Sequence, residues 1–318
     1  MSSKRIGRRD FLKSAWLAGA SVACAGVVRP ISLAGQPTRQ ASSSTNATRK
    51  FSLAYLTLFG CPPPEMIYIA ARAGYDFVSL RPIYMALPGE PNFDLAANPR
   101  LLAQTRAALS ATGLRVHDIE LARVQDGTDP RSYLPALEIG AELGATHVIS
   151  SIWTRDTVFA KESFAMLCDL AKPVGLTVDL EFVTFAAVKT LSEALEVLRS
   201  VRRDNCGLLV DVLHFSRSRV GLGELDAVPR EWFHFTHVND APAQIPATDE
   251  GLIHTAREER LYPGEGGIDI AAILDRIPDV PCSIELPNTV RVKEFGYAEH
   301  AFRCLETTKA YLKEHLDK

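Results

Sequence analysis

The chain has 318 residues, of which 47% are hydrophobic and 23% are charged, and its formal net charge is −3 at pH 7. This composition is typical of a globular protein with a large core, and it excludes disordered, collagen-like and polytopic membrane proteins. After residue 34 the chain holds 29 basic and 37 acidic residues, a net charge of −8, so we expect no nucleic-acid partner and no attraction to anionic lipid.

Residues 1–34 are predicted to be a cleavable twin-arginine signal peptide. The pair Arg8-Arg9 precedes an apolar run at 15–28, and residues 32–34 have the small side chains of a cleavage site. The run is too short to span a bilayer comfortably, so no stable membrane insertion is expected after cleavage. Lipidation at Cys24 is an open alternative to this cleavage. We therefore expect the twin-arginine export machinery as a partner and the periplasm as the location.

Residues 35–50 are rich in Ser, Thr, Gln and Ala and are predicted to be a flexible linker. Beyond it, residues 51–318 show no further linker and are predicted to form one domain. The cysteines of this domain are odd in number and form no Cys-x-x-Cys pair, which argues against a zinc ribbon or a dithiol redox motif.

Short apolar runs and amphipathic stretches alternate along the domain. The runs predict strands at 51–58, 76–80, 115–121, 146–152, 176–182, 207–212, 233–238 and 282–286. Helical periodicity is clear at 99–111, 134–143, 161–171 and 192–202. Eight strands, each followed by helical sequence, fit an α/β fold of the (βα)₈ barrel type, which typically has about 250 residues. The alternative is an open doubly wound sheet, but the first turn contains Pro62-Pro63-Pro64 where that fold has a glycine-rich phosphate loop.

Polar residues end the last four predicted strands, and the carboxyl ends of barrel strands converge on one mouth. These residues are Glu181, Asp211, His237 and Glu285. Each has an ordinary explanation alone: a helix cap, an ion pair or a core histidine. Three acids near one point would repel each other without a cation. Such an oxygen-rich set with one imidazole favours a single Mn²⁺ or Mg²⁺ ion, with Co²⁺ or Zn²⁺ as alternatives.

The loop Arg260-Leu-Tyr-Pro-Gly-Glu-Gly266 follows the seventh predicted strand. With the four strand ends it resembles the xylose isomerase-like TIM barrel family (sugar phosphate isomerase/epimerase), and in particular ketose 3-epimerases and hydroxypyruvate isomerases. The resemblance covers about residues 51–310. It implies that Glu181, Asp211, His237 and Glu285 bind the metal, that Glu181 and Glu285 are also the catalytic acid–base pair, and that His214 and Arg260 contact substrate oxygens.

Three further residues are candidates near these strand ends. Glu120 ends the third predicted strand and is either a substrate-binding residue or half of an ion pair with a neighbouring arginine. Asn239 and Asp240 follow His237, and we expect them to orient the ligand histidine or a metal-bound water. The family also includes an endonuclease for abasic sites, but the extra histidines of its zinc cluster are missing here.

The expected function is a divalent-metal-dependent isomerase or epimerase of a sugar or related polyhydroxy carbonyl compound. A carboxylate would remove the proton beside the carbonyl, and the metal would stabilise the enediolate. If a neighbouring hydroxyl then leaves, the same first step makes the protein a dehydratase of a keto-cyclitol or a dehydroshikimate-like compound. A third alternative is an exported carbohydrate-binding protein without turnover. The resemblance is also compatible with a homo-oligomer.

Overall fold

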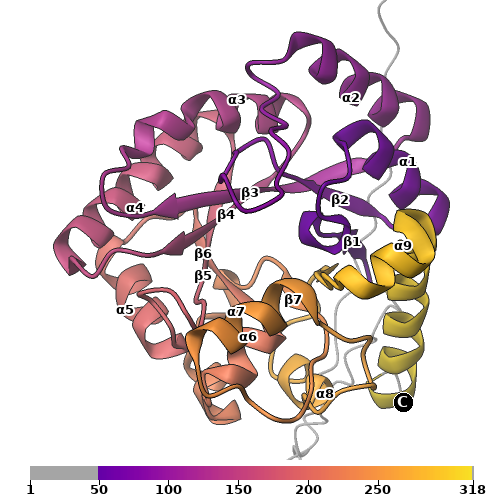
Figure 1. The fold of residues 1–318 in the computed structure, drawn as a ribbon. Helices are drawn as coiled ribbons and strands as arrows, with labels where there is room; N and C mark the ends of the chain where they lie inside the picture. Colours follow the sequence, from indigo (N-terminus) through magenta and orange to yellow (C-terminus); the bar gives the residue numbers. More distant parts are fainter. Residues whose placement is uncertain (1–48, 317–318) are drawn as a thin grey trace, which may run out of the picture. The chain divides into compact units, whose positions relative to one another are not determined.

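The computed structural model describes residues 49–316; the predicted signal peptide and nearly all of the predicted linker lie outside these residues. Parallel strands close into a barrel in the order β1 to β8, with β8 pairing with β1 (Figure 1). This confirms the (βα)₈ barrel prediction. The strands are β1 (Phe51–Leu53), β2 (Phe77–Leu80), β3 (Arg115–Val124), β4 (His147–Ile152), β5 (Thr177–Glu181), β6 (Cys206–Asp211), β7 (Thr236–Val238) and β8 (Cys282–Ile284).

Helices alternate with the strands and surround them (Figure 1). They are α1 (Pro63–Ala73), α2 (Pro99–Thr112), α3 (Leu134–Glu142), α4 (Thr157–Ala171), α5 (Leu191–Val201), α6 (Val212–Arg217), α7 (Asp249–Glu258), α8 (Ile270–Leu274) and α9 (Thr289–His315). Helix α7 lies within the long connection that follows β7. Within residues 49–316, no helix is long and apolar enough to cross a membrane.

Local sequence signals explain where the helices begin and end. The Asn98 side chain accepts a hydrogen bond from the Leu101 amide and caps α2, which ends at Gly113 in the left-handed conformation (φ 69°). Helix α5 begins with a capping box, in which the side chains of Thr190 and Glu193 each accept a hydrogen bond from the other residue's amide. These ends turn each helix back toward the next strand.

Most predicted strand boundaries differ from the structure by one or two residues, and the ends of β1 and β3 and the start of β7 differ by three or more. Strand β1 ends at Leu53, and Tyr55–Leu58 form a 3₁₀ turn because the Tyr55 amide donates to the carboxylate of Glu120 (3.1 Å) and not to a neighbouring strand. Strand β3 runs to Val124, beyond the predicted end, and its register with β4 shifts between Ile119 and Ala122. Such a bulge changes which side chains face the mouth of the barrel.

An apolar cluster fills the barrel below the predicted site. Leu209 and Phe235 lie two residues before Asp211 and His237, so they point to the same inner face, and they pack with Ile149 of β4. A polar cluster, the Asp179 cluster, comprises the buried Asp179 and the half-buried His147 and His234. The Asp179 carboxylate lies 2.6 Å from His234 Nδ1 and 3.2 Å from His147 Nδ1.

Glycine is required beside the Asp179 cluster. Gly207 of β6 pairs in register with Asp179, and a Cβ added there would lie 2.6 Å from both Asp179 Oδ1 and His234 Nδ1. Burial raises the pKa of Asp179, but hydrogen bonds from His147 and His234 outweigh burial, so its pKa lies well below the usual range. Burial lowers the pKa of His234, but Asp179 outweighs it and the net shift is upward.

We expect Asp179→Asn to lower the free energy of unfolding by about 3 kcal/mol, because it leaves two histidines without their buried counter-charge. The depressed Asp179 pKa stabilises the fold above its ordinary value of 3.8, and the raised His234 pKa stabilises it below 6.5. The loss should therefore be largest between these pH values. Urea unfolding across pH 3–9 with a chelator present measures it. The control is Asp169→Asn, which removes an exposed ion pair with Arg203; equal losses in both variants would contradict the prediction.

Candidate active site and metal centre

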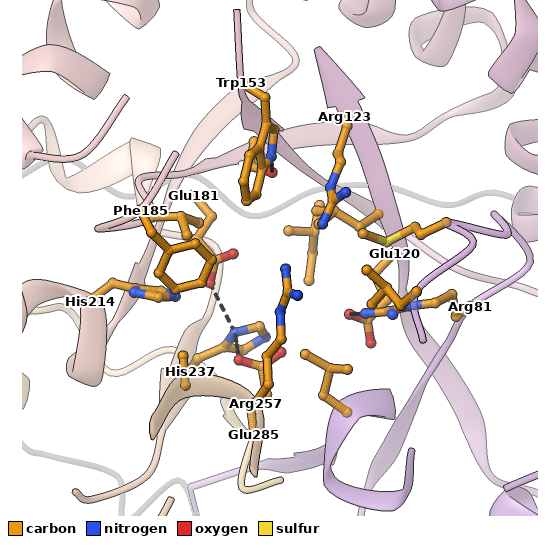
Figure 2. Close-up of a pocket in the computed structure, with 18 of the residues that line it drawn as sticks. Arg81, Glu120, Arg123, Trp153, Glu181, Phe185, His214, His237, Arg257 and Glu285 are labelled. Atoms are coloured by element: carbon orange, nitrogen blue, oxygen red, sulfur yellow. Dashed lines mark hydrogen bonds and ion pairs between the residues drawn. The ribbon is translucent and has the colours of Figure 1, made fainter. Parts of the chain in front are cut away.

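The structure brings together the four polar strand-end residues. Glu181, Asp211 and His237 lie on β5, β6 and β7, and Glu285 directly follows β8. One ligand atom from each lies within 4.8 Å of the others, and all four residues are at most 7% exposed. His237 Nδ1 is 3.4 Å from Glu181 Oε1 and 3.3 Å from Glu285 Oε2 (Figure 2). It is 3.9 Å from Asp211 Oδ2.

The donor atoms of this cluster fit a divalent ion. Both ring nitrogens of His237 and Oε1 of Glu181 are buried, and none of them has a hydrogen-bond partner among residues 49–316. Buried polar atoms without partners are costly unless something binds them. The charges of the cluster also favour a cation: three carboxylates face one arginine, Arg260, and with His237 in the neutral form that binds a metal, two negative charges remain. One divalent cation would neutralise them, and carboxylates with one imidazole suit such an ion.

The pKa values show how strongly this cluster attracts positive charge. Burial raises the pKa of Glu181 to about 7. Burial also lowers the pKa of His237, but Glu285 and Glu181 outweigh it and hold this pKa well above the usual value. Burial raises the pKa of Glu285, but His237 and Arg260 outweigh it and hold the pKa well below the usual range. The cluster therefore takes up either a proton or a cation.

Arg260 lies at the pocket, but the protein itself takes up most of its donors. Its Nη1 is 2.6 Å from Asp211 Oδ2, its Nη2 is 2.9 Å from Glu285 Oε2, and its Nε donates to the Ala256 carbonyl (2.7 Å). The side chain lines the pocket but is 2% exposed. Arg260 therefore holds two predicted ligand carboxylates in place, and its contact with substrate oxygens stays a prediction.

Asn239 and Asp240 are expected to orient His237 or a metal-bound water, and their side chains bind other groups of the protein. The Asn239 amide donates to Asp211 Oδ1 (3.0 Å), which also caps α6 through the Leu213 amide (2.7 Å). Asn239 therefore orients a carboxylate of the cluster, not the histidine.

The Asp240 carboxylate organises the loop that follows α7. It accepts hydrogen bonds from the four backbone amides of Ala241, Gly264, Gly266 and Ile268, at 2.8–3.1 Å. A Cβ at Gly266 would collide with this carboxylate and with the Ala241 carbonyl, so glycine is needed there. The oxygens of Asp240 are thus taken up by this loop, and its role toward His237 or a metal-bound water stays a prediction.

His214 and Glu120 both line the pocket. His214 Nδ1 lies 3.2 Å from Thr184 Oγ1, and burial lowers the pKa of His214 to about 4, so the ring is neutral near pH 7. Glu120 ion-pairs with Arg81 (2.8 Å). Glu120 thus forms the expected ion pair, with an arginine that directly follows the neighbouring strand β2, and it also lines the pocket where a substrate would bind.

The pocket beside the cluster has about 520 Å³ of empty space, part of it open to solvent. In Figure 2, Trp153 and Arg123 lie on one side of this pocket, and Arg257 extends into it from the side of His237 and Glu285. The sequence analysis missed Arg123 and Arg257. Arg123 lies beyond the predicted end of its strand and reaches the pocket after the register shift in β3, and Arg257 lies on α7. A charged residue inside the apolar run 121–124 was the available signal.

Comparisons with known proteins agree with this architecture. The family model for the xylose isomerase-like TIM barrel matches residues 67–308. An inosose isomerase of Bacillus licheniformis is 32% identical over 122 residues, which are 37% of this chain and 41% of that protein. The chain's match thus spans less than half the length of this curated relative.

Solved structures show the same fold. The crystal structure of the IolI protein with a bound zinc atom has a TM-score of 0.71 and 20% identity, covering 85% of this chain and all of that one. A D-allulose 3-epimerase from Methylomonas sp. in complex with D-allulose has a TM-score of 0.61 and 18% identity, covering 83% and 97%. At these identities the likeness concerns the fold.

Proposed function

Because this chain belongs to the xylose isomerase-like TIM barrel family, we propose that it is a divalent-metal-dependent isomerase or epimerase of a sugar or related polyhydroxy carbonyl compound. The observation that carries the proposal is the convergence of Glu181, Asp211, His237 and Glu285 beside a pocket. A protein that only binds carbohydrate has no need of two carboxylates with raised and lowered pKa values at one point. The inosose isomerase relatives support the same reaction class.

The four residues of the cluster would hold the ion. When bound, a divalent ion polarises a substrate carbonyl and stabilises negative charge on its oxygen. The Glu181 carboxylate takes the proton from the carbon beside the carbonyl. For an epimer, Glu285 must first take up a proton from solvent, which it then gives to the opposite face of the carbon, leaving Glu181 protonated. For an isomer, Glu181 returns its own proton to the neighbouring carbon while a hydroxyl proton moves from one oxygen to the other. Neutral His214 donates a hydrogen bond to a substrate hydroxyl.

The donor set supports Mn²⁺ or Mg²⁺ as the ion in use, ahead of Co²⁺ or Zn²⁺, because three of the four donors are carboxylates. Elemental analysis of protein purified without added metal, followed by reconstitution with each ion, tests this assignment. Full activity with Zn²⁺ alone would contradict it.

Solvent exchange tests the proposed reaction. The Mn²⁺-loaded protein is incubated in D₂O with ketoses, inososes and hydroxy keto acids, and the products are analysed by mass spectrometry. Carbon-bound deuterium in a product of otherwise unchanged composition supports the isomerase or epimerase. Loss of one water would identify the dehydratase instead. Binding without exchange at carbon for every compound would leave a binding protein and overturn the proposal.

The proposed location is the periplasm, reached by the twin-arginine route. The Arg8-Arg9 pair and the apolar run after it support this. A reporter fused to residues 1–50 should be exported, and replacing both arginines with lysine should retain it in the cytoplasm. Unchanged export of the double variant would contradict the twin-arginine route.

A further inference from the structure

Two arginines in the pocket, Arg123 and Arg257, form no ion pair with any residue that the structure describes. Arg81 ion-pairs with Glu90 and Glu120, and Arg260 is held by two carboxylates of the cluster. In contrast, no ion pair or hydrogen bond links the side chain of Arg123 or Arg257 to any of residues 49–316. Nε of Arg123 is buried without a partner. Both guanidinium groups extend into the pocket from opposite sides (Figure 2).

Each of these arginines lies against an aromatic ring. The Arg123 guanidinium is 4.4 Å from the ring centroid of Trp153, and that of Arg257 is 5.6 Å from the ring of Phe185. The Trp153 indole donates to Ser151 Oγ (2.9 Å), which fixes its platform. Stacking on a ring face holds a guanidinium in position while its N–H edge stays available for hydrogen bonds.

The arrangement is unfavourable without an anion. Burial lowers the pKa of Arg123 to about 10, and the charges of Arg257 and Arg81 add to this effect. Burial also lowers the pKa of Arg257, again with a contribution from Arg81. Two half-buried cations that face one pocket repel each other, and a bound oxyanion would relieve this repulsion. A planar guanidinium binds a carboxylate or phosphate through two parallel hydrogen bonds.

We propose that Arg123 and Arg257 form a receptor for an anionic oxygen group of the substrate, in the pocket beside the metal cluster. The proposal rests on the proposed function for the reacting end of the substrate. The substrate is then a polyhydroxy carbonyl compound that carries a carboxylate or a phosphate ester, not a neutral sugar. The anion binds between the arginines, and the carbonyl end faces Glu181 and Glu285.

Three matched non-reacting probes test the receptor: D-glucitol, D-gluconate and D-glucitol 6-phosphate. Their binding to the Mn²⁺-loaded protein is measured by calorimetry for the wild type, Arg123→Met, Arg257→Met and the control Arg199→Met, an exposed arginine on α5. We expect at least one anionic probe to bind about tenfold or more tightly than glucitol. Each pocket variant should lose most of this preference and keep its glucitol affinity, whereas Arg199→Met should match the wild type.

The anionic probe that responds to the arginines identifies the group: gluconate indicates a carboxylate and glucitol 6-phosphate a phosphate ester. An anion preference that survives in both pocket variants means that the anion binds elsewhere, for example at the metal, and overturns the receptor. Equal wild-type affinities for the three probes also overturn it. If deuterium exchanges into neutral ketoses and no anion preference is found, the receptor proposal is wrong and the proposed function stands. If the preference for anionic probes depends on the arginines but no compound exchanges deuterium at carbon, the proposed function is wrong and the receptor stands.

Discussion

Glu181→Gln is expected to abolish incorporation of solvent deuterium into the substrate, with a loss of about 10³-fold or more in kcat. The amide has nearly the same shape as the carboxylate but cannot accept the proton from carbon. Glu181 lines the pocket, and its buried Oε1 has no hydrogen-bond partner among residues 49–316, so the substitution removes a base and leaves the packing intact. Exchange is followed by mass spectrometry in D₂O.

The control for this variant is Glu138→Gln, which makes the same replacement of a carboxylate oxygen by an amide nitrogen at an exposed glutamate on α3. Manganese content is measured in both variants, because Glu181 is also a predicted metal ligand. A Glu181→Gln variant that keeps its manganese and still exchanges deuterium at the wild-type rate would remove Glu181 from the mechanism.

Arg260→Met is expected to destabilise the metal-free protein by about 3–5 kcal/mol, because Asp211 and Glu285 lose their buried counter-charge. Saturating Mn²⁺ should then restore more stability to the variant than it adds to the wild type, since three carboxylates remain to be neutralised. Urea unfolding with chelator and with Mn²⁺ measures both quantities.

A matched control for Arg260 is Arg203→Met, which removes an exposed ion pair with Asp169 and should cost about 1 kcal/mol or less. If Mn²⁺ stabilises Arg260→Met no more than it stabilises the wild type, the ion does not neutralise the carboxylates of Asp211 and Glu285.

The convergence of the four strand-end residues could be predicted from the sequence for a geometric reason. Parallel strands of a barrel end at one mouth, so a charged residue at the end of an apolar run is placed without knowing the helices. The apolar run at 115–121 also predicted strand β3. It could not predict the bulge in this strand, because a register shift depends on how β3 pairs with β4. Arg123 was missed for that reason.

The hydrogen bonds that Asp240 and Arg260 form with distant segments could not be predicted from the sequence. The sequence put Asp240 beside His237, but the four amides that bind its carboxylate come from the backbone of Ala241 and of residues 264–268. Likewise, the motif placed Arg260 at the mouth but could not show that Asp211 and Glu285 take up its donors. Hydrogen bonds between segments far apart in the chain are decided by packing, not by local pattern.

The most direct measurement of the central claim is an anomalous difference map from crystals grown with Mn²⁺. The account predicts one strong peak at about 2.2 Å from carboxylate oxygens of Glu181, Asp211 and Glu285 and from a ring nitrogen of His237. The Asp179 cluster is the other group among residues 49–316 whose ligand atoms lie close enough to hold an ion. A peak there with none at the four strand ends, or no peak at either place, would contradict the account.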